Sequence, residues 1–115
     1  MSILETLKGA KNFLNTGKDR EKTPCICYAI TDYVASVYGR GQVYAQGSEA
    51  YLMREAAQSY VMYKLQDLTP ECVFDSRATS TVLGIPQHRL VDEYFQLARH
   101  LWLDSLIKEL ENENN

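Results

Sequence analysis

Apolar positions recur at spacings of three and four residues along four stretches of the chain, separated by polar or glycine-rich segments. This is the period of an amphipathic α-helix, whereas a half-buried strand would alternate residue by residue. In the longest stretch, Leu97, Leu103 and Ile107 extend the apolar arc beyond one stripe. A helix that is apolar on several sides is either central to its fold or shared with a partner. The four predicted helices span residues 2–17, 23–38, 48–66 and 90–110.

Capping residues support these helix ends. Ser2 is followed three residues later by Glu5, the capping-box pattern of a helix start. Thr23-Pro24 is a second start signal, because proline fits the first helical position, where its missing amide costs nothing. Gly17 and Gly39 can end the first two helices in the left-handed conformation that glycine tolerates. We therefore expect a first helix of about four turns.

The connecting segments are less regular. Gly39–Gly47 contains three glycines in nine residues, which predicts a loop with room for a short extended piece at 43–45. Cys72–Phe74 fits a short helical piece. Asp75–Thr81 is polar and rich in serine and threonine, and either a loop or another helix start is compatible with it.

The predicted fold is therefore mainly α: a compact bundle of about four main helices, with the glycine-rich loop between the second and the third. A chain of 115 residues has the usual size of one domain. We assign 1–110 to a single helical domain and expect 111–115, an acidic and asparagine-rich tail, to fray. The wide apolar arc of Leu90–Leu110 predicts a homodimer through this helix.

Charge and cysteine content restrict the environment and the partners. Twelve basic and 15 acidic residues give a net charge of −3, which does not favour nucleic acid or an anionic membrane. No apolar run is long enough for a bilayer, and no secretory signal precedes the first helix. With no such signal, Cys25, Cys27 and Cys72 are interpreted as reduced, packed thiols. We expect a cytoplasmic protein without membrane contact.

The residues with catalytic or metal-binding chemistry do not form a recognisable site in the sequence. Cys25 and Cys27 are two residues apart on a helix and point about 200° away from each other, so they cannot chelate one metal ion together. His88 and His100 each stand beside an arginine and are interpreted as solvated or rim residues. We predict no metal, no cofactor and no enzymatic activity.

The glycine loop allows one ligand hypothesis. Backbone amides between Gly39 and Gly47, with Arg40 as a counter-charge, could hold a small anion. The lysine that follows the last glycine of a phosphate-binding P-loop is missing, because Ser48 and Glu49 stand there instead. A binder of a small anionic ligand is therefore the second alternative function.

Residues 80–90 carry a local resemblance to a known family. The small Ser80, the turn Leu83-Gly84-Ile85 and the apolar Leu90 resemble the turn of a helix-turn-helix DNA-binding module. The resemblance implies that a recognition helix follows and brings residues to a major groove. Because each phosphate contact needs a cation, the nearby Asp92 and Glu93 weigh against this reading, and a DNA-binding regulator is the first alternative. The DNA-contacting residues would be Gln87, His88 and Arg89.

Tyrosine is the residue type most out of proportion, with eight in the chain. Tyrosine combines a large contact area with a hydroxyl that tolerates water, and it is enriched at protein interfaces. Tyr33 and Tyr94 fall on apolar faces and are expected to be half-buried. Tyr60 and Tyr63 lie one turn apart and with Met53 can form a patch. The predicted partner-binding residues are Tyr28, Tyr38, Tyr44, Met53, Tyr60 and Tyr63.

The phrase Cys25-Ile26-Cys27-Tyr28-Ala29-Ile30 after a charged turn, together with the small size, resembles the accessory proteins encoded by bacteriophages. This resemblance implies binding to, and inhibition of, a host enzyme or defence complex. The main functional hypothesis is thus a small, non-enzymatic protein–protein interaction module whose partner is another protein.

Overall fold

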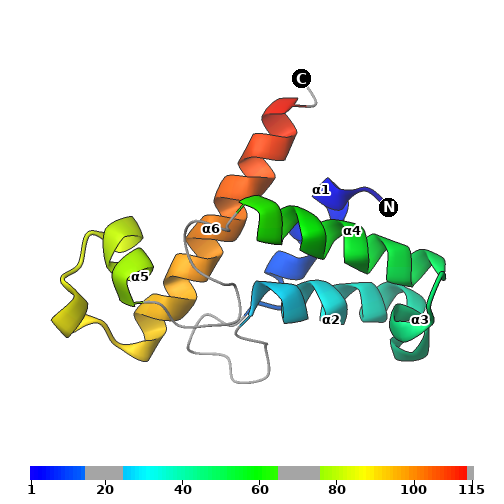
Figure 1. The fold of residues 1–115 in the computed structure, drawn as a ribbon, viewed down its shortest axis with the longest axis horizontal. Helices are drawn as coiled ribbons and strands as arrows, with labels where there is room; N and C mark the ends of the chain where they lie inside the picture. Colours follow the sequence, from blue (N-terminus) through cyan, green and yellow to red (C-terminus); the bar gives the residue numbers. More distant parts are fainter. Residues whose placement is uncertain (15–24, 65–75, 114–115) are drawn as a thin grey trace.

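A computed structural model describes residues 1–14, 25–64 and 76–113 of the chain, and these residues form helices and connecting turns without strands. The predicted mainly α fold is confirmed (Figure 1). The elements are, in chain order, α1 (Ile3–Lys11), α2 (Ile26–Tyr38), α3 (Arg40–Tyr44), α4 (Glu49–Lys64), α5 (Ser76–Leu83), the 3₁₀ turn η1 (Gln87–Arg89) and α6 (Asp92–Glu113).

The predicted cap at Ser2 is present, Gly39 ends α2 as predicted, and Ser48 caps α4. The hydroxyl of Ser2 accepts a hydrogen bond from the backbone amide of Glu5 at 3.1 Å, and that of Ser48 accepts from the amide of Tyr51 at 3.0 Å. Each satisfies one of the amides that a helix start leaves without an intrahelical partner. The predicted signals at Gly17 and Thr23-Pro24 lie outside the described residues.

The first helix is shorter than predicted. α1 ends at Lys11, and single turns carry the chain through Asn12 and Phe13. The prediction of about four turns relied on Phe13 and Leu14 continuing the period. Leu14 is instead buried beyond the end of the helix, because it packs into the core from the turn.

The segment 39–47 was wrongly predicted to be a loop, since it contains helix α3. Gly39 (φ +102°) and Gly47 (φ +83°) take left-handed conformations that glycine adopts at little cost. Gly41 lies within the helix. Val43 is fully buried and holds the short helix against the core. The Ser48 hydroxyl donates to the Gln42 carbonyl at 2.7 Å and closes the turn after the helix.

In the second half of the chain, the structure shows which of the segments left open by the sequence are helical. Residues 76–81 belong to helix α5, which Gly84 (φ +70°) ends by donating its amide to the Ser80 carbonyl at 2.8 Å. α6 continues to Glu113, so residues 111–113 of the predicted tail are helical, and 114–115 lie outside the described residues. The predicted piece at 72–74 lies outside the described part of the chain.

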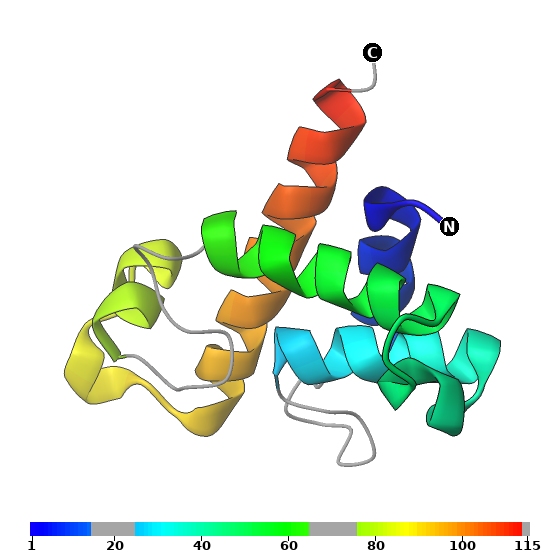
Figure 2. The same ribbon diagram turned by 45° about the vertical axis from the view of Figure 1, so that its right-hand side comes forward.

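α1 is the central element of the packing. It contacts α2, α4 and α6, while α2 also contacts α3 and α4. α5 packs against α6 and η1, at the other end of α6 from the C-terminus (Figures 1 and 2). The core side chains with no exposed surface are Leu7, Ala10, Leu14, Ile26, Ala29, Ile30, Val34, Val43, Ala57, Val61, Ala98 and Leu103.

Polar contacts fix α6 against α1 and α4. Lys11 Nζ lies 2.6 Å from Asp104 Oδ1, and Lys64 Nζ lies 2.7 Å from Glu109 Oε1. His100 Nε2 lies 3.1 Å from the Leu14 carbonyl. His100 is thus a half-buried contact between two segments rather than a solvated residue, and the preceding arginine is buried as well.

The thiol prediction is wrong for one of the two cysteines at the start of α2. Cys25 is disulfide-bonded, so it does not support a reducing compartment. Cys27 is a buried thiol, as predicted. Among the described residues, no helix combines the length and the apolar content needed to cross a bilayer.

Candidate protein-docking surface

The six predicted partner-binding residues do not form one surface. Tyr28, Tyr44 and Tyr63 are exposed, with 61%, 61% and 67% of their surface accessible. The other three, Tyr38, Met53 and Tyr60, are partly buried. Of the three residues of the predicted patch, Tyr63 is exposed, while Met53 and Tyr60 each keep only part of their surface accessible. Tyr63 follows Tyr60 by three positions and therefore lies about 60° around the helix axis from it. This turns Tyr63 to solvent, while Tyr60 packs against the core.

Tyr38 has a structural role in the fold. Its hydroxyl donates to Glu49 Oε1 at 3.2 Å and joins the end of α2 to the start of α4. Partial desolvation, followed by the negative charge of Glu49, raises the pKa of Tyr38. Both effects favour the neutral phenol, which keeps its proton for this hydrogen bond.

Tyr60 lies on the side of α4 that faces α6. Its hydroxyl oxygen is buried and finds no hydrogen-bond partner within the described ranges 1–14, 25–64 and 76–113. Lys64 Nζ, which pairs with Glu109, lies 5.7 Å from the ring centroid. Desolvation by burial, with a smaller contribution from Glu109, raises the pKa of Tyr60. The ring contributes packing, but its hydroxyl is desolvated without compensation.

Replacing Tyr60 by phenylalanine is accordingly expected to raise the free energy of unfolding by about 1 kcal/mol. Because the pKa of Tyr60 is raised in the folded state, the wild-type protein keeps its full stability below the ordinary pKa of 10.0. It loses stability as pH rises through the raised value, since the unfolded chain then ionises Tyr60 more readily. Urea denaturation at pH 7 and between pH 10 and 11 measures both effects. Tyr60→Phe should lose less stability at high pH than the wild type.

Tyr63→Phe is the matched control, because the Tyr63 hydroxyl is on an exposed residue of the same helix. Its stability should stay within about 0.5 kcal/mol of the wild type at pH 7. Equal stabilities of Tyr60→Phe and the wild type at both pH values would contradict the assignment of an uncompensated buried hydroxyl.

The solvent side of α4 carries an apolar surface that the sequence analysis missed in part. We define the outer α4 face as Leu52, Ala56, Ser59, Met62 and Tyr63. Leu52 is 58% exposed and Met62 56% exposed. Leu52, Ala56, Ser59 and Tyr63 follow at spacings of four, three and four, so they lie within an arc of about 60° on one side of the helix.

A second stripe of apolar residues on α4 also has helical spacing, so the exposed stripe could not be recognised from the sequence. Ala50, Ala57 and Val61 also recur at helical spacing, and these are the α4 residues buried by the neighbouring helices. Helical spacing alone does not show which of the two stripes is buried. The only signal that separates them is side-chain size, since alanine allows α1 and α2 to approach α4 closely.

Arg54 joins α4 to α3 on the side of the helix away from this surface, since it follows Leu52 by two positions and lies about 200° around the axis from it. Its Nε donates to the Val43 carbonyl at 3.2 Å, and its Nη1 donates to Gln58 Oε1 at 3.0 Å. The guanidinium carbon lies 4.9 Å from the Tyr51 ring centroid and 5.9 Å from that of Tyr44. These contacts join α3 to α4 and hold the exposed Tyr44 ring beside Arg54. Arginine and tyrosine are the residue types most enriched in interface hot spots.

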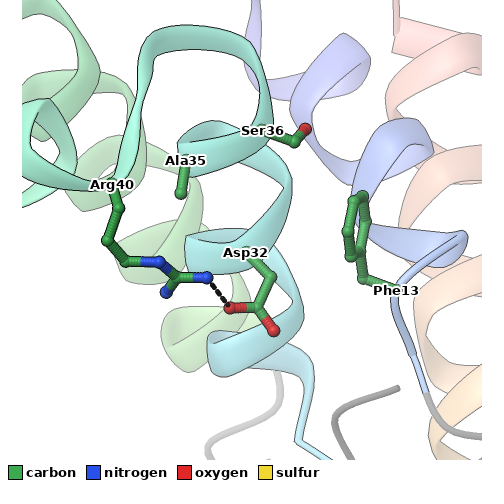
Figure 3. A pocket seen from close by; sticks show the side chains of 5 residues that line it. All are labelled: Phe13, Asp32, Ala35, Ser36 and Arg40. Carbon is green, nitrogen blue, oxygen red and sulfur yellow. Dashed lines mark hydrogen bonds and ion pairs between the residues drawn. The ribbon is translucent and has the colours of Figure 1, made fainter. Parts of the chain in front are cut away.

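An open pocket lies elsewhere, between the end of α1, α2 and the start of α3. Its volume is about 320 Å³, and its lining residues are Phe13, Asp32, Ala35, Ser36 and Arg40 (Figure 3). Arg40 Nη2 donates to Asp32 Oδ1 at 3.2 Å. The arrangement does not favour the predicted anion cradle, because the intended counter-charge already faces a carboxylate and the segment around it forms helix α3.

The resemblance to a helix-turn-helix module does not extend to the geometry. Gln87, His88 and Arg89 are exposed, but they form the 3₁₀ turn η1. The next α-helix begins only at Asp92, so the predicted recognition helix does not start directly after Gly84-Ile85-Pro86. The three residues stand before a helix whose first turn carries Asp92 and Glu93.

The apolar surplus of α6 is largely used inside the chain. Leu103, Leu106 and Ile107 are buried, whereas Leu97 and Leu101 remain 46% and 40% exposed. The two exposed leucines lie one turn apart. They are what remains for the predicted homodimer contact through this helix, and they form a smaller surface than the outer α4 face.

No group of three or more His, Cys, Asp and Glu side chains within residues 1–14, 25–64 and 76–113 is arranged to hold a metal ion. No protein-family model matches the chain, and no match was found among the curated proteins or the solved structures. The surfaces described above are therefore the basis for proposing a function.

Proposed function

We propose that this protein is a protein–protein interaction module that docks its partner on the outer α4 face. The observation that supports it is the exposure of Leu52, Met62 and Tyr63 on a helix whose buried residues, Ala50, Ala57 and Val61, lie on another side. Contiguous apolar surface on a folded chain is typical of an interaction site, whereas isolated apolar residues are not.

The composition of the surface suits a polypeptide partner. Leu52 and Tyr63 are large anchors at the two ends, and the small Ala56 and Ser59 between them allow a backbone to approach. A helix that crosses α4 near these small residues diverges from it toward the ends, where larger side chains fill the widening gap.

The partner proposed is another protein, with a host enzyme or a defence complex as the class suggested by the resemblance to bacteriophage accessory proteins. DNA binding is not proposed as a second function, because η1 is a single 3₁₀ turn and the next helix starts with two acidic residues. Binding of a small anion at residues 39–47 is likewise not proposed.

Site-specific photo-crosslinking tests the proposal. A photoreactive amino acid at Ser59 should crosslink to a defined polypeptide in lysate of the natural host, identified by mass spectrometry. Leu52→Lys and Tyr63→Ala should each reduce that crosslink by about tenfold, because losing a large side chain that anchors the partner costs about 1.4 kcal/mol or more. Circular dichroism checks that the variants remain folded.

Leu101→Lys is the matched control, an exposed leucine on α6 rather than α4. It should leave the crosslink from Ser59 unchanged. Retention of the crosslink by both α4 variants, together with its loss in Leu101→Lys, would move the docking surface to α6 and contradict the proposal.

A further inference from the structure

The open pocket between α1, α2 and α3 has an uneven charge distribution. Asp32 and Arg40 form its ion pair, but Arg40 approaches the carboxylate from the side away from Phe13 (Figure 3). The second carboxylate oxygen points away from Arg40. The side chain of Arg40 is 64% exposed and that of Asp32 only 22% exposed, so the carboxylate lies deeper in the pocket.

The opposite wall is also electronegative. Phe13 turns the face of its ring toward α2 across the pocket (Figure 3), and the face of an aromatic ring is the negative end of its quadrupole. The Tyr33 ring is its neighbour, with the two ring centroids 6.3 Å apart and the ring planes inclined at 56°. A group between these walls therefore meets a carboxylate oxygen on one side and a π face on the other, which is an environment for a cation.

The other residues that line the pocket also favour a positively charged ligand. The Ser36 hydroxyl donates its proton to the Tyr33 carbonyl at 2.6 Å, so toward the pocket its oxygen can only accept. Ala35 gives an apolar floor against which methylene groups can pack. The positive charge of Arg40 is opposed by Asp32, and the chain as a whole carries −3. An anion would approach the carboxylate and the ring face at a cost.

We propose that this pocket binds a guanidinium or alkylammonium group, placed over the Phe13 ring and hydrogen-bonded to Asp32. This group is the head of an arginine or lysine side chain of a partner protein, or of a small free organic cation. The inference does not depend on the outer α4 face, because none of the lining residues belongs to α4.

The test is an NMR titration of the labelled full-length protein at low salt with N-acetyl-arginine methylamide and with methylguanidinium. Shifts should centre on the Phe13 and Ser36 amides, with an affinity in the millimolar range, as expected for an exposed cation–π contact with one ion pair. The neutral N-acetyl-citrulline methylamide should give no such shifts. Tighter binding of the blocked arginine would assign the site to a protein side chain, and equal binding would assign it to a small cation.

Two variants with opposite expected effects make the test decisive. Asp32→Asn should weaken binding at least about threefold, whereas Arg40→Gln should strengthen it by about the same factor, because it removes a competing cation from the carboxylate. Phe13→Leu keeps an apolar side chain but removes the π face, and should also weaken binding. The reverse signs, namely loss with Arg40→Gln and gain with Asp32→Asn, would overturn the proposal, as would the absence of shifts in the wild type.

Discussion

Leu103→Ala is expected to lower the free energy of unfolding by about 2–5 kcal/mol, the range measured for large-to-small changes in well-packed cores. Leu103 has no exposed surface and lies in the part of α6 that joins the common core with α1. The loss combines the transfer of the removed methyl groups with the cavity that remains. Against a typical total stability of about 5–15 kcal/mol, this change is large enough to unfold part of the population.

Leu101→Ala provides the control for the same substitution two residues earlier on the same helix. Its side chain is 40% exposed, so the change should cost less than about 1 kcal/mol. Urea denaturation followed by circular dichroism measures both values. Similar losses for the two variants would mean that α6 does not pack with the orientation described.

Gly9→Ala is expected to destabilise the protein by about 1–3 kcal/mol through overpacking. Alanine is normally preferred to glycine inside a helix by about 1 kcal/mol, so the expected sign is opposite to that of helix propensity. The reason is tertiary: a methyl group on Gly9 would coincide with the ring of Tyr33, which packs directly on the α1 backbone. That ring is held between α1 and α2 and has little room to move.

Gly41→Ala separates this effect from propensity. Gly41 is also helical, but a methyl group added there meets no atom within 4 Å. It should leave stability unchanged or raise it by up to about 1 kcal/mol. The comparison uses thermal and urea unfolding of the two variants. A stabilised Gly9→Ala would show that Tyr33 does not occupy this position.

Local sequence signals located the helices because they depend on neighbouring residues alone. The three- and four-residue period and the caps at Ser2 and Ser48 depend on backbone geometry that each segment carries by itself. The glycine-rich segment failed for the opposite reason. Its propensity favours a loop, and the burial of Val43 against the rest of the molecule, which no local pattern reports, stabilises α3.

The candidate surfaces could be predicted only in part. Of the tyrosines predicted to bind a partner, Tyr28, Tyr44 and Tyr63 are exposed. Tyrosine enrichment could not separate these from Tyr38 and Tyr60, because an amphiphilic ring suits both a half-buried and an exposed position. The pocket was not foreseen, since Phe13 and Asp32 are 19 positions apart and acquire a common role only when α1 packs against α2.

The amino-acid sequence by itself determined that the chain is helical, where α1 and α4 begin and where α2 ends, and that the chain has more apolar side chains than a single face of each helix can bury. Only the tertiary structure decided which apolar stripe of α4 is buried, that Arg40 faces Asp32, and that Tyr33 replaces a side chain at Gly9. The physical reason is that helix formation depends on short-range hydrogen bonds and side-chain entropy. Burial depends on which surfaces can approach most closely, a property of pairs of helices rather than of either sequence segment.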